Sequence, residues 1–424
     1  MEARKKRQKS NKKEKSKEAN VKKVKDIMDT SAWKEAEWIH SGLYAQTLFP
    51  LGGMNPSPSE IDGYMEEILK RCPGYFPALF QRGGYMLSTG NTLEGEKFIE
   101  KGFEWMEAVL KEKEELYESI SNAVEQLEKL LRFDLAKKYL EKAARLFPGK
   151  ADLYDDLAYC VLQLPDGDQN EALELHKKAL DMEPKNSDFL SNLGWTHLIM
   201  GNYEEAEIYI KKSLELNKNN EIAWGNLKIL KYIAKKNLTF FDYLLRPVDM
   251  EKLNALSEKE ETDKVVNLCR EYNIDRLDAF KIYHMKNAKF PPHVIQDIMQ
   301  TIKIFMGFVD KITMNEIFLY EDIDLIHVDF KYFMHKFIFK FGDVDDEILD
   351  DVYRSLTHFY DFLRELKLIE SGQYVKFIKD IDGLKDELFH KMHEYNKIRR
   401  DDTMSEEEKE EIREELFEGD HSFF

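Results

Sequence analysis

The sequence predicts an all-helical protein, in which an α-solenoid of stacked helix pairs is followed by a compact all-helical domain. Three observations favour this fold class. Glycine and proline, with 20 and 11 residues among 424, are too scarce for a turn-rich β fold. Apolar residues recur at helical spacing along most of the chain. Between about residues 60 and 240, a pattern of small and large apolar residues repeats every 34 residues.

Charge is distributed unevenly along the chain. The 63 Lys and Arg residues are outnumbered by 81 Asp and Glu residues, which gives a net charge of −18. Residues 1–25 carry a net charge of +9, and residues 401–424 carry −9. An acidic body repels phosphate, so binding of nucleic acid along the whole chain is not expected. The 43% of hydrophobic residues exclude wholesale disorder.

Residues 1–25 form a basic arm with almost no apolar residues, and we expect this arm to be disordered. Such an arm could bind nucleic acid, ribosomes or an acidic partner, serve as a nuclear localisation signal, or only keep the protein soluble. The arm lacks aromatic residues, which argues against stacking on bases. Its candidate contact residues are Arg4, Lys5, Lys6, Arg7, Lys12 and Lys13.

The first expected helix covers residues 26–48, and the Gly- and Pro-rich run at residues 49–58 predicts a loop. Residues 62–72 then resemble the second helix of a degenerate repeat unit. Together with the units that follow, these segments make up the predicted solenoid at residues 26–245.

The repeat is clearest at residues 187–220. Large apolar residues stand at positions 4, 7 and 24 of this unit, and small residues stand at positions 8, 20 and 27: Leu190, Leu193, Gly194, Ala206, Ile210 and Ser213. The same frame fits residues 117–150, residues 151–186 with two extra residues, and more loosely residues 76–109. A capping helix is expected from residue 221. The small residues predict close contacts between the two helices of a unit.

These units resemble the tetratricopeptide repeat (TPR) family over about residues 60–240. The resemblance implies a right-handed superhelix of helix pairs, in which no unit buries its apolar face alone. It also implies that the first helix of each unit lines a concave groove, with positions 2, 5, 6 and 9 facing a bound peptide. Chaperone-type repeats carry basic residues at these positions to hold a terminal carboxylate, whereas this sequence carries acidic residues.

The predicted peptide-binding groove is therefore acidic and contains recurrent asparagines. Position 6 is occupied by Asn122, Asp156, Asn192 and Asn226, which is similar to the asparagine ladder of some peptide-binding superhelices. The alternative is that these residues are ordinary solvated polar groups. The complete set of candidate residues is Glu118, Asn122, Glu125, Asp152, Asp155, Asp156, Tyr159, Asp188, Asn192, Trp195 and Asn226.

After residue 245 the period stops, but helical spacing of apolar residues continues. We expect a compact helical domain at residues 250–400, which resembles no family closely enough to be assigned, and an acidic tail at residues 401–424. The segment at residues 329–341 is both basic and aromatic, so it could contact phosphate.

Motifs for chemistry are weak. The segment from Gly90 to Phe98 superficially resembles a phosphate-binding loop but has the wrong spacing, so an inter-helix turn is expected. His390 and His393 lack the further carboxylates of a di-iron site, and we expect no metal and no cofactor. The three cysteines are widely separated, which indicates reduced core thiols. No apolar run is long enough to span a membrane, and no secretory signal is expected.

The sequence thus predicts a cytoplasmic, non-enzymatic adaptor or scaffold that binds an extended, basic peptide segment in the acidic groove. One alternative is a nucleic-acid- or ribosome-associated factor that contacts phosphate through the basic arm. Another is a regulatory subunit with an unrecognised activity in the C-terminal domain. Fold alone does not choose among these functions.

Overall fold

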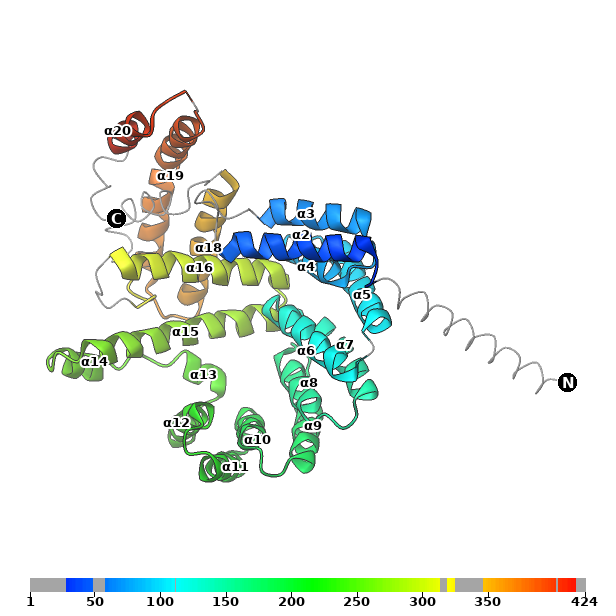
Figure 1. Ribbon diagram of the computed structural model, residues 1–424. Coiled ribbons are helices and arrows are strands. Elements are labelled where there is room, and N and C mark those ends of the chain that lie inside the picture. The colour runs from blue at the N-terminus through cyan, green and yellow to red at the C-terminus, as the bar shows by residue number, and fades with distance from the viewer. Residues whose placement is uncertain are drawn as a thin grey trace. The chain divides into compact units, whose positions relative to one another are not determined.

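The structure is a computed structural model, and it describes residues 28–48, 58–110, 112–312, 319–324, 346–401 and 403–416. Over these residues every regular element is a helix, as the sequence predicts (Figure 1). The chain divides into two compact units. Unit 1 comprises residues 1–196 and 212–220, and unit 2 comprises residues 197–211 and 221–424. The division falls within two repeat helices, whereas the sequence predicts a domain boundary near residues 245–250, which stays a prediction.

The helices of unit 1 follow one another as antiparallel pairs, each packed on its neighbours along the chain (Figure 1). They are α2 (Ser31–Leu48), α3 (Pro58–Arg71), α4 (Phe76–Ser88), α5 (Thr92–Val109), α6 (Lys113–Lys129), α7 (Phe133–Leu146), α8 (Asp152–Gln163) and α9 (Gln169–Met182). The next pair, α10 (Ser187–Ile199) and α11 (Tyr203–Leu216), contributes residues to both units. These bounds agree with the helix pairs predicted at residues 76–109, 117–150, 151–186 and 187–220.

Small residues lie where the sequence places the close helix contacts. The predicted alanines are completely buried, and Gly194 is buried as well: Ala136, Ala143, Ala158, Ala172, Ala179 and Ala206. Ala158 of α8 and Ala172 of α9 share one apolar cluster with Val161. Between α4 and α5, a Cβ atom added to Gly95 would lie 3.0 Å from the carbonyl oxygen of Gly83. The predicted role of small residues is confirmed, because larger side chains would separate these helices.

A left-handed residue ends the first helix in three of the repeat units. Gly90, Leu131 and Gly201 all stand at position 15, with φ angles of +81°, +55° and +79°. This conformation is a common way to stop a helix, and it favours glycine because a Cβ atom is strained there. Leu131 adopts it without that freedom, which indicates that the surrounding turn enforces it.

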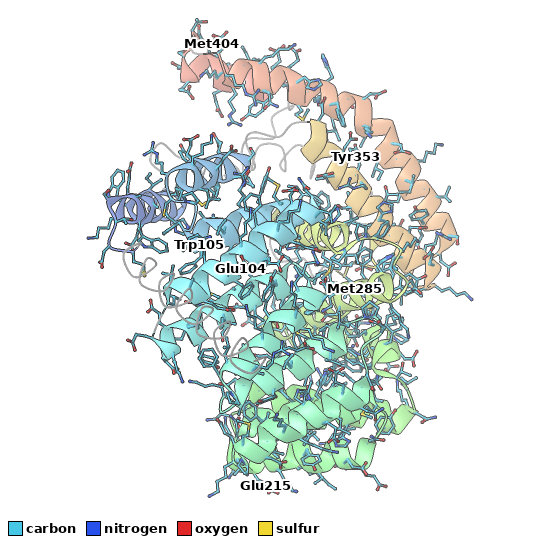
Figure 2. All side chains as sticks on the ribbon, turned by 90° about the vertical axis from the view of Figure 1, so that its right-hand side faces the viewer. Glu104, Trp105, Glu215, Met285, Tyr353 and Met404 are labelled. Atoms are coloured by element: carbon cyan, nitrogen blue, oxygen red, sulfur yellow. The ribbon has the colours of Figure 1, made fainter. Side chains whose placement is uncertain are left out.

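Unit 2 continues with helices of more variable length. They are α12 (Glu221–Lys236), α13 (Phe240–Leu244), α14 (Met250–Ser257), α15 (Thr262–Lys286), α16 (Pro292–Ile312), α18 (Asp346–Glu365), α19 (Ser371–Arg399) and α20 (Glu406–Leu416). Helix α15 contacts α13, α14 and α16, and α18 packs between α16 and α19. Large aromatic rings fill this core, with Phe280 of α15 against Phe359 and Phe362 of α18. Figure 2 shows side chains on these helices, with Tyr353 marking α18 and Met285 marking α15.

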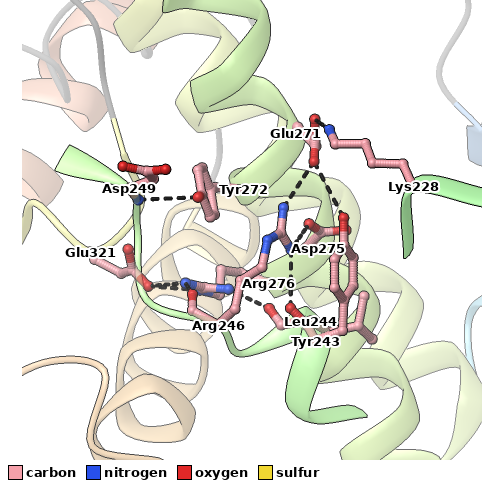
Figure 3. Close-up of polar contacts among 10 residues, drawn as sticks. All are labelled: Lys228, Tyr243, Leu244, Arg246, Asp249, Glu271, Tyr272, Asp275, Arg276 and Glu321. Atoms are coloured by element: carbon pink, nitrogen blue, oxygen red, sulfur yellow. Dashed lines mark hydrogen bonds and ion pairs between the residues drawn. The ribbon is translucent and has the colours of Figure 1, made fainter. Parts of the chain in front are cut away.

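Two buried arginines tie the chain after the last repeat to α15 (Figure 3). Arg246 pairs with Glu271 at 2.9 Å and with Asp275 at 2.5 Å. Arg276, which is 1% exposed, pairs with Glu321 at 2.6 Å and donates to the carbonyl oxygens of Leu244 and Arg246. A buried guanidinium needs all of its donors satisfied, and these contacts fix the path of residues 244–246.

Several predicted segments lie outside the described residues. They are the basic arm at residues 1–25, residues 49–57 of the predicted loop at 49–58, the basic aromatic segment at 329–341 and the end of the acidic tail at 417–424. The last residue of the predicted loop, Pro58, instead begins α3. Among the residues that are described, no helix is long and apolar enough to cross a membrane.

Candidate functional site

The predicted groove residues of unit 1 lie on α6, α8 and α10, the first helices of three successive repeat units. Glu118, Asn122 and Glu125 are exposed on α6. On α8, Asp152 and Tyr159 are exposed, whereas Asp155 and Asp156 are half-buried. Asp188 is exposed on α10, and Asn192 and Trp195 are half-buried there. The sequence therefore predicts the helices correctly, but it overestimates the exposure of Asp155 and Asp156.

Helix α8 carries the densest group of acidic side chains. Asp152, Asp155 and Asp156 are spaced three and four residues apart, so they lie on one face of the helix. Asp152 and Asp155 also lie in the first turn, where the unpaired backbone N–H groups favour negative charge. The helix start thus tolerates a concentration of carboxylates that would be unfavourable elsewhere.

Asp155 is held by neighbours from two other helices. Asn192 of α10 donates from Nδ2 to Asp155 Oδ2 at 2.8 Å. His176 of α9 places Nε2 3.5 Å from Asp155 Oδ1, and its Nδ1 lies 2.7 Å from Thr196 Oγ1. Burial raises the pKa of Asp155 to about 6, Asn192 opposes this shift, and the charges of Asp152 and Asp188 add to it. Asp155 thus joins three helices, which sequence spacing did not reveal.

Asp156 has no hydrogen-bond or ion-pair partner within the described ranges. Burial, together with the negative charges of Asp155, Glu128 and Asp152, raises the pKa of this carboxyl to about 7. Glu128 of α6 accepts a hydrogen bond from Cys160 Sγ at 3.3 Å, and burial raises its pKa too. These four residues, Glu128, Asp152, Asp155 and Asp156, are called the acidic cluster below.

Further contacts fix the predicted groove residues that lie around the acidic cluster. Tyr117 donates its hydroxyl to Asp152 Oδ2 at 3.2 Å. Burial raises the pKa of Tyr117 to about 12, and the charge of Asp152 contributes, so the phenol remains a donor at neutral pH. Asp188 accepts from Asn220 Nδ2 at 2.8 Å. Tyr159 stays 44% exposed and packs edge-on against Phe133, with 6.0 Å between ring centroids.

The predicted asparagine ladder is only partly assembled. Asn192 uses its amide to hold Asp155, and Asn122 makes no side-chain contact with another candidate residue in the part of the chain that is described. Asn226 belongs to unit 2 and is only 8% exposed, so the expectation of an open polar side chain is wrong at this position. The asparagines of unit 1 therefore do not form a continuous row of amides that could pair with a peptide backbone.

The weaker motifs have structural roles in the described residues. Residues 89–91 form a turn that leads into α5, as the interpretation of the apparent phosphate loop predicts. His393 contacts Asp346 at 2.5 Å, and no described group of three His, Cys, Asp or Glu residues could hold a metal ion. The three cysteines are buried free thiols. Thr196, His176 and Asp155 form a hydroxyl–imidazole–carboxylate chain, but Thr196 is completely buried, so its hydroxyl meets no substrate.

The sequence analysis did not identify three residues that belong to the acidic cluster or are linked to it through side-chain contacts. Glu128 follows Glu125 by three residues on the same helix face, and this spacing could have revealed it. His176 and Thr196 are buried residues of α9 and α10, and neither stands at a position that the repeat marks as facing a peptide. Contacts between helices, rather than periodicity, bring them to Asp155.

Comparison with known proteins gives matches to short parts of the chain. Residues 164–228 match the family model of the tetratricopeptide repeat. A segment of 72 residues is 39% identical to the human protein named Protein SGT1 homolog, covering 17% of this chain and 20% of the relative. Another of 94 residues is 32% identical to bovine BBSome complex member BBS4, covering 22% and 17% of the two chains. The chain thus spans about a fifth of the length of these relatives.

Solved structures of repeat proteins are also similar. YrrB, described as a TPR protein with an unusual peptide-binding site, matches with a TM-score of 0.33 and 18% identity, covering 50% of this chain and 99% of that one. The P58(IPK) TPR domain matches with a TM-score of 0.22 and 11% identity, covering 88% and 98%. The repeat pattern, the antiparallel helix pairs with buried alanines and the match to the family model together identify tetratricopeptide repeats in the part of the chain around residues 164–228.

Proposed function

We propose that this protein is a non-enzymatic adaptor whose acidic cluster, in the groove predicted for its repeats, binds a Lys- or Arg-containing segment of a partner protein. Asp156 is the observation that carries the proposal. It is half-buried, has no partner among the described residues and is repelled by three neighbouring carboxylates. A cationic side chain beside it would remove that repulsion and favour its ionised form.

Nearby groups support a cation rather than an anion. Asp152 is exposed beside Asp156, and Tyr159 is exposed four residues after Asp155 on the same helix. An exposed aromatic ring next to carboxylates suits a guanidinium or ammonium group, because the ring face attracts cations. An acidic peptide would instead meet the charges of Asp152 and Asp188.

The asparagines have a smaller part in this proposal than the repeat pattern predicts. Asn192 orients Asp155, and the exposed Asn122 is left to pair with a peptide backbone. The basic arm lies outside the described residues, so its contact with nucleic acid stays a prediction. So does the location of the protein in the cytoplasm.

Fluorescence anisotropy of one basic and one acidic labelled peptide tests the proposal. We expect the wild type to bind the basic peptide more tightly, with an affinity that falls as salt increases. The double variant Asp152→Lys, Asp156→Lys should lose this binding. It leaves Asp155 in place because that residue bonds to Asn192.

Glu114→Lys is a suitable control, because Glu114 is exposed on α6 and pairs with Lys150 rather than with the acidic cluster. Circular dichroism would show that all variants remain helical. Tighter binding of the acidic peptide, or equal binding by the double variant, would show that the acidic cluster is not the binding surface.

A further inference from the structure

Beneath the acidic cluster lies a buried polar chain that joins α8, α9 and α10. His176 of α9 is 2% exposed, and its two ring nitrogens point to different partners. Nδ1 lies 2.7 Å from the hydroxyl oxygen of Thr196, and Nε2 lies 3.5 Å from Asp155 Oδ1. Asp155 Oδ1 is buried and accepts no hydrogen bond within the described residues, whereas Oδ2 accepts from Asn192.

The hydrogen-bonding requirements of Asp155, His176 and Thr196 favour one tautomer of His176. If Nδ1 carried the proton, Nε2 would present a lone pair to the Asp155 carboxylate, and the two groups would repel each other. If Nε2 carries the proton, the N–H group faces Oδ1, and Nδ1 accepts from the Thr196 hydroxyl at 2.7 Å. The other acceptor within reach of this hydroxyl, the carbonyl oxygen of Asn192, is farther away at 3.1 Å. The imidazole is neutral in either case, because burial lowers its pKa to about 4. Only the second arrangement supplies a donor to the buried Oδ1 atom.

We propose that His176 is a positioning residue for peptide binding, because its Nε2–H group fixes the Asp155 carboxylate and leaves Asp152 and Asp156 to meet a cationic side chain. This inference rests on the proposed function for its consequence, but not for its geometry. Asp155 is then a carboxylate with one oxygen bonded to Asn192 of α10 and the other facing the Nε2–H group of α9. It sets the spacing of α8 against these helices and contributes its charge to the cluster.

Ring-nitrogen NMR of the full chain, labelled with ¹⁵N-histidine, tests the tautomer directly. The His176→Phe variant identifies the signals, and we expect the wild type at about pH 7.5 to show a protonated Nε2 and an unprotonated Nδ1. Carboxyl NMR with ¹³C-aspartate gives the second readout. Loss of the N–H group in His176→Phe should raise the pKa of Asp155 by about one unit, because an N–H dipole that faces a carboxylate favours its charged form.

Two substitutions of Thr196 separate hydrogen bonding from packing. Thr196→Val keeps the shape of the side chain and removes the hydroxyl, whereas Thr196→Ser keeps the hydroxyl and removes a methyl group. We expect Nε2 to stay protonated in both variants, because its N–H group still faces Asp155 Oδ1. The Nδ1 signal should shift in Thr196→Val, which lacks the hydroxyl donor, and should resemble the wild type in Thr196→Ser. Asp152, Asp188 and Asn192, the other groups that act on Asp155, are unchanged in both.

A protonated Nδ1 in the wild type would overturn the proposal, and so would an unchanged pKa of Asp155 in His176→Phe. A larger effect of Thr196→Ser than of Thr196→Val would assign the role to packing and also overturn it. Peptide binding is measured separately. If the predicted tautomer is found but the wild type does not prefer a basic peptide, the proposed function fails while the assignment of the polar chain stands.

Discussion

Helices α6–α9 in unit 1 and helices α13–α18 in unit 2 use different means to pack. In the first region, buried alanines at fixed positions bring neighbouring helices close together, as Ala158 and Ala172 do. In the second, large aromatic rings such as Phe280 and Phe362 pack against each other between helices, and the buried Arg276 holds the segment that follows α13. A contact between helices that recurs in every repeat unit produces a periodic pattern in the sequence. A contact that occurs only once produces no such pattern.

The largest expected effect on the free energy of unfolding comes from removing a non-repeated contact in unit 2. Arg276→Met would leave the half-buried Glu321 without its partner and would leave two carbonyl oxygens without donors. We expect the free energy of unfolding to fall by about 3–5 kcal/mol, because breaking a buried ion pair leaves the desolvation cost of the remaining charge uncompensated. Urea unfolding gives the magnitude, and hydrogen exchange should show the loss in α15.

Arg354→Met is the matched control for this prediction. Arg354 forms an ion pair with Asp351 at 2.7 Å, but both side chains are exposed. Such pairs contribute about 0–1 kcal/mol. If the two substitutions had equal effects, the buried arginine would not be the element that holds this region.

The repeated contacts should be less costly to disturb one at a time. Ala172→Leu adds three carbon atoms where α9 meets α8 without free space, and we expect a loss of about 1–3 kcal/mol. Hydrogen exchange should rise in α8 and α9. Ala234→Leu, at an exposed position of α12, serves as the control and should change stability little. An equally stable Ala172→Leu variant would argue against close packing at this pair.

Asp156→Asn should stabilise the repeats while weakening peptide binding. The pKa of Asp156 is raised to about 7 in the folded protein, chiefly by burial, and lies near 4 in an unfolded chain. The folded state therefore binds more protons between about pH 4 and 7, so stability decreases as pH rises through this window. An asparagine side chain does not titrate, so the variant lacks this decrease in stability. We expect a gain on the order of 1–2 kcal/mol at about pH 8 and little gain near pH 4.

Thermal unfolding at both pH values measures this difference. Asp181→Asn, at an exposed position of α9, is the control and should change stability little at either pH. Destabilisation by Asp156→Asn at pH 8 would mean that Asp156 is engaged in a favourable contact and is not an unneutralised charge.

The repeats could be predicted from the sequence nearly to the residue, because each close contact between helices requires a small side chain at the same position of every unit. Ala136, Ala172 and Gly194 show this relation plainly. The acidic character of α8 could be predicted for the same reason, since Asp152, Asp155 and Asp156 stand at positions that the repeat assigns to one helix face.

The finer structure of the site could not be predicted in this way. His176 and Thr196 reach Asp155 through contacts between helices, which depend on side-chain distances and not on a period. The expected openness of Asn226 was wrong because polarity alone does not indicate exposure. The pairing of Arg246 and Arg276 with residues 25 to 45 positions away similarly leaves no local signal.

The pH dependence of basic-peptide affinity tests the central claim most directly. A cationic side chain favours the ionised form of Asp156, so binding should release protons and should strengthen as pH rises from about 5.5 to 8. In Asp156→Asn the affinity should be lower at pH 8 and should change much less over the same range. An affinity that does not depend on pH, or that is equally dependent in Asp156→Asn, would contradict the assignment of Asp156 as the carboxylate that receives the cation.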